Sequence, residues 1–167
     1  MFGRDILSRV IWGSRISLLV GVISVSLGLG VGLVIGALAG YYGGILDEIF
    51  MRIMDAFFAF PMLLLGLVVI AVLGSGVQNL MVALGIIYIP RFARIVRGGF
   101  LSLREKEYVE SARAAGESDG YVMLHCILPN TMAPIIVNTA VSFAVAILVE
   151  AVFSFLGLGV QPPTPAS

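Results

Sequence analysis

The chain has 167 residues, of which 59% are hydrophobic and 12% are charged, and its mean hydropathy is +1.07. Soluble domains carry charge on roughly a quarter of their residues, so this composition excludes a soluble globular domain and indicates an integral membrane protein with one helical domain. The formal net charge is +0, yet the positive charges are concentrated in one part of the chain. A single cysteine, Cys126, excludes an internal disulfide.

The N-terminal part combines a short basic segment with a long apolar run. Residues 1–15 carry Arg4, Arg9 and Arg15, and we expect this segment to lie in the membrane interface. The apolar run at about residues 16–40 predicts a first membrane span. Glycines recur in it every four residues, at Gly28, Gly32, Gly36 and Gly40. We expect Gly21 to lie on the same face of the helix. Such spacing predicts a close helix contact, either within this subunit or with a partner.

Three further runs are long enough to cross the membrane as helices of about 20 residues. They cover about residues 49–73, 77–95 and 133–156. In the second run we expect Pro61 to kink the helix and Arg52 to pair with Asp55 or to reach the interface.

The distribution of arginine and lysine predicts the orientation of the chain. Most of the positive residues lie between the third and fourth spans, at Arg91, Arg94, Arg97, Arg104, Lys106 and Arg113. The positive-inside rule places this loop, about residues 97–128, in the cytoplasm. By alternation, residues 41–48 are cytoplasmic, while residues 74–79 and both ends of the chain face outward.

The long loop itself predicts two short helices that project from the membrane. Residues 104–115 favour a helix, and Gly116 stands where a left-handed residue ends one. Ser118 is an N-cap for a second helix to about Cys126, which Pro129 is expected to stop. We interpret this rigid projection as a docking site for a cytoplasmic protein.

Polar residues within the spans are further candidates because their burial in lipid is costly. Glu150 and Asn138 lie in the fourth span, where either a path-lining role or a structural hydrogen-bonding role is open. Met and Phe residues at positions 51–62 either line a permissive path or pack between helices. His125 and Cys126 have no further metal ligands nearby in the sequence, so no metal site is predicted.

The long loop also resembles a family motif. Glu110-Ser111-Ala112, then Gly116, then Leu128-Pro129 are similar to the EAA loop of binding-protein-dependent ABC importer permeases. Ser111 replaces the first alanine of that pattern, and Cys126 replaces its isoleucine. The motif keeps its glutamate and its glycine.

Other segments resemble the C-type subunit of the dipeptide, oligopeptide and nickel subfamily. They are Gly3 to Arg9, Ala39 to Gly44, Leu101 to Glu105 and Ser154 to Pro165. The resemblance covers nearly the whole chain and implies an all-α, polytopic transmembrane bundle of the type I ABC importer kind, with four spans and a cytoplasmic coupling insert. Because members of the subfamily have one more span at each end, we expect this chain to be either a core fragment or a truncated member.

The resemblance implies a non-catalytic permease subunit in the inner membrane, without a cofactor. Its partners would be separate ABC ATPase subunits, a second homologous permease and an extracytoplasmic solute-binding protein. The ATPase-coupling residues that carry over are Glu110, Ser111, Ala112, Gly116, Leu128 and Pro129. The solute would be a peptide, nickel or a related small molecule.

The residues themselves add one point and leave one alternative open. No Gly-x-x-x-x-Gly-Lys-Ser/Thr loop is present in the sequence, so the nucleotide would have to bind to another chain. Composition alone also allows a secondary transporter or a channel that works without ATP.

Overall fold

The computed structural model describes the backbone of residues 6–158 and the side chains of residues 13–158. Every regular element in this part of the chain is helical, which confirms the predicted all-α class. The elements are α1 (Ile6–Tyr42), α2 (Gly44–Phe58), α3 (Met62–Leu73), α4 (Val77–Leu103), α5 (Glu107–Ala114), α6 (Asp119–Tyr121), the π-helical turn η1 (Val122–Ile127) and α7 (Leu128–Phe155). The motif segments at residues 3–5 and 159–165 lie outside the described residues.

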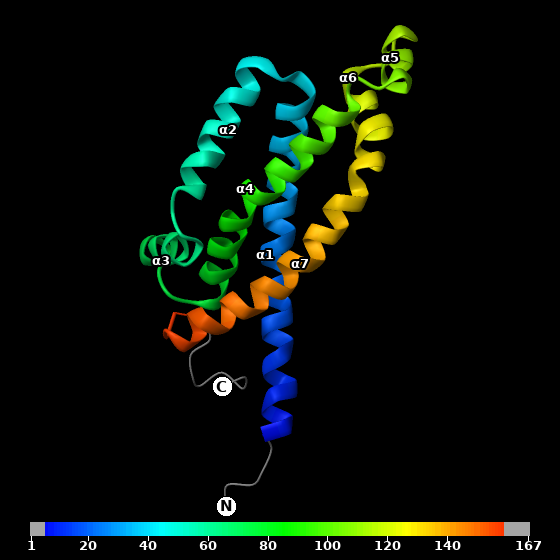
Figure 1. Ribbon diagram of the computed structural model, residues 1–167. Coiled ribbons are helices and arrows are strands. Elements are labelled where there is room, and N and C mark those ends of the chain that lie inside the picture. Colours follow the sequence, from blue (N-terminus) through cyan, green and yellow to red (C-terminus); the bar gives the residue numbers. More distant parts are fainter. Residues whose placement is uncertain (1–5, 159–167) are drawn as a thin grey trace, which may run out of the picture.

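Three helices in the described chain are long and apolar enough to cross a membrane. They cover Gly13–Tyr42, Val77–Leu103 and Asp119–Phe155. Residues 6–15, which we expected to lie in the interface, form the first part of the straight helix α1 (Figure 1).

The expected second span is broken rather than kinked. Helices α2 and α3 are bent by 94° at the break between them, and the pair counts as a fourth span only if the two are taken together. Pro61 stands directly before α3 with ψ at 135°. Proline lacks the amide hydrogen that a continuous helix needs and disfavours helical geometry in the residue before it, so the chain turns here.

The α1–α4 contact organises the bundle, and all four glycines of the repeat lie on it. An added β-carbon would lie 2.5 Å from Tyr88 Cβ at Gly28, 2.7 Å from Phe92 Cβ at Gly32, and 2.6 Å from Phe100 Cβ at Gly40. At Gly36 it would meet the Ala93 carbonyl oxygen. The repeat therefore forms a contact within this subunit, where only glycine lets the two backbones approach so closely.

Gly21 does not belong to that contact. A β-carbon there would lie 2.9 Å from the Phe143 ring, which belongs to α7. Gly21 and Gly28 lie about two helical turns apart, so they share a face of α1 as expected, but at Gly21 this face meets α7, which crosses α1 at this level (Figure 1).

Helix α4 extends further than its apolar run suggested. It continues without a break to Leu103, so Arg91, Arg94 and Arg97 lie on a helix and not in a loop. Its contact with α1 reaches Gly40 and Phe100, and this packing holds the helix beyond the apolar segment.

Pro129 does not stop the helix before it, contrary to expectation. The chain passes from η1 into α7 with Pro129 in the first turn of α7. In a π-helical turn each backbone hydrogen bond spans one residue more than in an α-helix. Proline is tolerated in the first turn of a helix because an amide there would have no partner within the helix. Asn130 Nδ2 donates to the Cys126 carbonyl oxygen at 2.8 Å across this junction.

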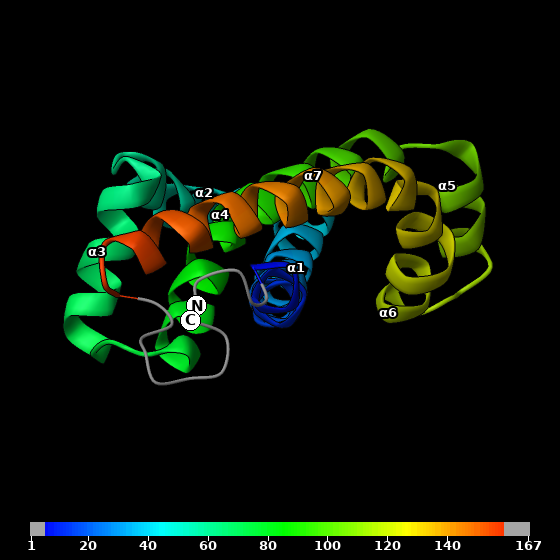
Figure 2. The same cartoon turned by 90° about the horizontal axis from the view of Figure 1, so that it is seen from below.

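The helices of the described chain form a bundle whose two ends carry different elements. The end of α1, the start of α2, and α5 with α6 lie at one end, whereas the start of α4 and the end of α7 lie at the other (Figure 1). Viewed along the bundle, α2 and α3 lie on one side of α1 while α5 and α6 project on the opposite side (Figure 2). The projecting helices are thus free of the rest of the bundle over most of their surface.

The glycine contact leads to a stability prediction. Gly32→Leu or Gly36→Leu places a large side chain against the backbone of α4, so we expect each to destabilise the full-length permease by roughly 2–3 kcal/mol. Gly30 is the matched control because it lies on the same helix with open space around its α-carbon. Thermal unfolding in detergent is the measurement, and an equal loss of stability in Gly30→Leu would contradict the assigned contact.

Candidate functional site

The projecting element, which we call the knob, consists of residues 104–127 between α4 and α7. Its interior is a small apolar core in which Val109, Val122 and Ile127 are fully buried together with Phe100 of α4 and Tyr41 of α1. Because these side chains come from α5, from η1 and from two long helices, the knob is packed against the bundle at its base.

The first knob helix, α5, ends in a complete glycine-dependent cap. Gly116 has φ of +86°, its amide donates to the Arg113 carbonyl oxygen at 3.0 Å, and the Glu117 amide donates to that of Ala112 at 3.2 Å. This pair of bonds satisfies carbonyls at the helix end and requires the left-handed conformation that glycine adopts most easily. The predicted helix end at Gly116 is confirmed, although the helix begins at Glu107 rather than near Arg104.

Ser118 begins the second knob helix, as predicted. Its hydroxyl oxygen accepts a hydrogen bond from the Tyr121 amide at 3.4 Å, and Asp119 follows in the first turn. That helix is brief, and the chain continues through η1 into α7.

The knob is tied to the end of α1 by contacts that the sequence analysis missed. Tyr41 Oη donates to Asp119 Oδ1 at 2.6 Å, and Tyr42 Oη lies 3.4 Å from Asp119 Oδ2. The Arg113 guanidinium lies over the Tyr41 ring, 4.9 Å from its centre. The pair of tyrosines at the predicted end of a span was the only signal in the sequence, and it did not reveal which partner they bind.

The predicted coupling residues occupy two positions around the knob. Glu110, Ser111 and Gly116 are exposed on α5 and its cap, and Ala112 is half-buried beside them. Leu128 packs against the knob core, and Pro129 begins α7. The motif thus combines an exposed face with the junction that carries the knob into a long helix.

Glu150 and Asn138 do not form one site. Glu150 is only 4% exposed and accepts hydrogen bonds from Ser17 at 2.8 Å and Ser154 at 2.7 Å. Asn138 lies twelve residues earlier, or about 18 Å along α7, and accepts a hydrogen bond from Arg91 at 3.4 Å. For Glu150 the geometry favours the structural alternative, a hydrogen-bonding link between α1 and α7.

Two arginines of α4 bind carboxylates of α2. Arg94 pairs with Asp55 at 2.5 Å, and Arg97 binds Asp47 through two nitrogens. The expected pair between Asp55 and Arg52 therefore does not form. The reason is that α4 passes beside α2, so that Arg94 reaches Asp55 and Arg97, one turn further along α4, reaches Asp47.

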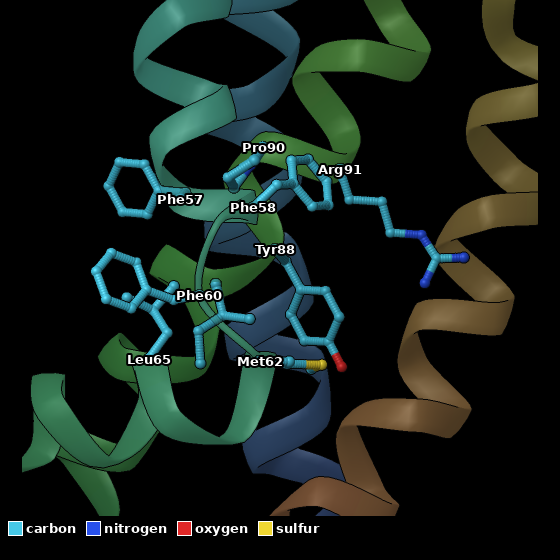
Figure 3. A pocket seen from close by; sticks show the side chains of 9 residues that line it. Phe57, Phe58, Phe60, Met62, Leu65, Tyr88, Pro90 and Arg91 are labelled. Atoms are coloured by element: carbon cyan, nitrogen blue, oxygen red, sulfur yellow. The ribbon is translucent and has the colours of Figure 1, made fainter.

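The aromatic residues next to the helix break line a pocket of about 190 Å³. Phe57, Phe58 and Phe60 contribute one wall, Met62 and Leu65 of α3 a second, and four residues of α4 a third (Figure 3). The residues of α4 are Ile87, Tyr88, Pro90 and Arg91. The sequence left open whether these side chains line a path or pack between helices. In the described chain they surround space rather than fill it.

Residues 32–167 match the family described as "Binding-protein-dependent transport system inner membrane component". The chain is 48% identical over 163 residues to the glutathione transport system permease protein GsiD of Pectobacterium atrosepticum. It is 45% identical over 164 residues to the dipeptide transport system permease protein DppC of Alkalihalophilus pseudofirmus. Both alignments cover 98% of this chain and 54% of the relative, so the chain spans about half the length of the curated relatives it matches.

A solved structure supports the fold independently. It is titled "Inward facing conformations of the MetNI methionine ABC transporter". The alignment covers 95% of this chain and 79% of the chain in that structure, with a TM-score of 0.79. The sequence identity is 20%, so this likeness concerns the arrangement of helices.

The cap of α5 predicts a difference between two glycines of the knob. Gly116→Ala forces a side chain into the left-handed region at a cost of about 1 kcal/mol, so we expect amide hydrogen exchange in α5 to accelerate roughly fivefold. Gly120 is the control because its φ is not positive and no atom lies within 4 Å of an added β-carbon. Exchange in α5 that is equally fast in Gly120→Ala would contradict a specific role of the cap.

Proposed function

The chain belongs to the family of binding-protein-dependent transport system inner membrane components, and from this membership we propose that it is a permease subunit of an ATP-driven importer. It is a multi-pass membrane protein, and its relatives are permeases of glutathione and dipeptide transport systems. We infer a solute of the same class, a short peptide or a peptide-like molecule, while a nickel complex remains within the wider subfamily.

The knob is the proposed docking site for a separate ATPase. Its exposed face carries Glu107, Glu110 and Glu117, whose charges are free to meet a basic groove on another protein. The 167 residues contain no phosphate-binding glycine loop, which supports placing ATP hydrolysis in a partner chain.

The proposed coupling depends on how the knob joins the bundle. It is continuous with α4 through one short turn and with α7 through η1, and Asp119 and Arg113 contact Tyr41 at the end of α1. A displacement of the knob would therefore move three long helices together. Helix α4, with 27 residues, is about 40 Å long, so it can carry this movement across the membrane.

The remaining proposed partners follow from the family. A second homologous permease would complete the path with its own knob, and an extracytoplasmic binding protein would deliver the solute to the opposite end of the bundle. The alternative, a transporter or channel independent of ATP, would be favoured by solute flux through the assembled permeases in liposomes without ATP.

Charge reversal on the knob tests the docking proposal. In the assembled transporter we expect Glu110→Lys to insert normally but to reduce ATP-driven uptake roughly tenfold, because a like charge then faces the basic groove. Glu48→Lys is the control, since Glu48 is exposed on α2, and α2 and α5 lie on opposite sides of α1 (Figure 2). Copurification of the ATPase is the second measurement. Normal uptake and copurification with Glu110→Lys would refute the proposal.

The membrane orientation is tested by labelling. In a Cys126→Ser background, Glu117→Cys on the knob should react with an impermeant maleimide only from the cytoplasmic side, whereas Gln78→Cys should react only from outside. Both positions are exposed and lie at opposite ends of the bundle, and the positive-inside rule orients them. The reverse pattern of labelling would overturn the orientation.

A further inference from the structure

Arg91 differs from the other arginines of α4 in what it contacts. Arg94 and Arg97 each bind a carboxylate of α2, whereas Arg91 has no carboxylate oxygen within 4 Å among the side chains of residues 13–158. Its guanidinium donates to the Asn138 side-chain oxygen at 3.4 Å. Arg91 stands about 21 Å from the start of α4, within a helix that is long and apolar enough to cross a membrane. A cation at such a depth is costly without a counter-charge.

Two buried hydroxyl groups close to this arginine also lack partners. Tyr88 is 2% exposed and Ser142 is fully buried, and neither side-chain oxygen has a hydrogen bond. Leaving such a group without a partner costs about 1–3 kcal/mol. Tyr88 stands one turn before Arg91, and Ser142 one turn after Asn138. Because α4 runs toward the knob and α7 away from it, both hydroxyls belong to the same level of the α4–α7 interface.

The polar groups lie beside the aromatic pocket at the break between α2 and α3. Figure 3 shows the Tyr88 hydroxyl and the Arg91 guanidinium both pointing toward α7, while their stems line the pocket beside Phe58 and Met62. The result is an apolar space walled in part by the two side chains that carry the cation and the unpartnered hydroxyl. An anion with an attached apolar or aromatic group fits this combination.

We propose that Arg91, with Asn138, Tyr88 and Ser142, binds a carboxylate of the solute within the membrane, and that the aromatic pocket receives the adjoining side chain. The guanidinium supplies charge and a planar pair of donors that match a carboxylate, and the Tyr88 and Ser142 hydroxyls supply donors that nothing else in the described chain uses. The site therefore selects peptide-like acids. This inference rests on the proposed function as a solute path.

The anion preference can be tested without transport. In the full-length permease with Cys126→Ser, an Asn138→Cys reporter should react faster with an anionic methanethiosulfonate, the sulfonatoethyl reagent, than with the cationic trimethylammonioethyl reagent. Arg91→Gln should lower this rate ratio about tenfold, since a hydrogen-bonded charge contributes that much, and Arg91→Lys should preserve most of it. Arg52→Gln is the control, because Arg52 is exposed on α2. A ratio that Arg91→Gln leaves unchanged would overturn the inference.

Uptake by the assembled transporter tests whether the anion is the solute. We expect Arg91→Gln to reduce ATP-driven uptake of a dipeptide about tenfold and uptake of the same dipeptide as its C-terminal amide by much less, with an unchanged binding protein in both cases. Equal reductions for the two peptides would show that Arg91 is structural and would refute the proposal. Failure of the wild-type transporter to take up either peptide with ATP would instead refute the proposed function, and the reporter experiment would still decide the anion preference.

Discussion

The close approach of α1 and α4 through four glycines is the constraint on which the rest of the structure depends. Side chains in lipid gain little from leaving the hydrocarbon, so helices associate through backbone proximity and packing. Gly28, Gly32, Gly36 and Gly40 each meet a different turn of α4, and the contact is therefore continuous over most of a membrane thickness. The position of α4 in turn determines where its arginines lie and where the knob begins.

The arginines of α4 differ in the helix that each of them contacts. Asp47 and Asp55 bind Arg97 and Arg94, and they hold α2 against α4 although α2 and α3 are separated by a sharp bend. Arg91 is turned toward α7, where its partner among the described residues is the Asn138 side-chain amide. One helix thus carries both a structural set of charges and a charge that is available to another molecule.

Three prolines show why local rules were insufficient. Pro61 stands at the break between α2 and α3, directly before the first residue of α3. Pro90 lies buried within α4 and leaves the helix intact, because packing against α1 holds both halves. Pro129 follows a π-helical turn and begins a helix that it was expected to end. Each proline has the same covalent geometry, and the neighbouring helices decided its effect.

The sequence by itself determined the membrane class, the glycine repeat, the cap at Gly116, the N-cap at Ser118 and the resemblance of the loop to a known motif. These features depend on composition or on residues close together in the chain, so local chemistry specifies them. Only the tertiary structure decided that the glycines face α4, that Gly21 faces α7, that Asp55 binds Arg94, and that Asp119 joins Tyr41. Asp55 and Arg94 are 39 residues apart in the sequence, and Tyr41 and Asp119 are 78 apart. No local periodicity encodes which helix passes beside which. The same holds for Arg91, whose position next to Asn138 and the aromatic pocket follows from the crossing of α4 and α7.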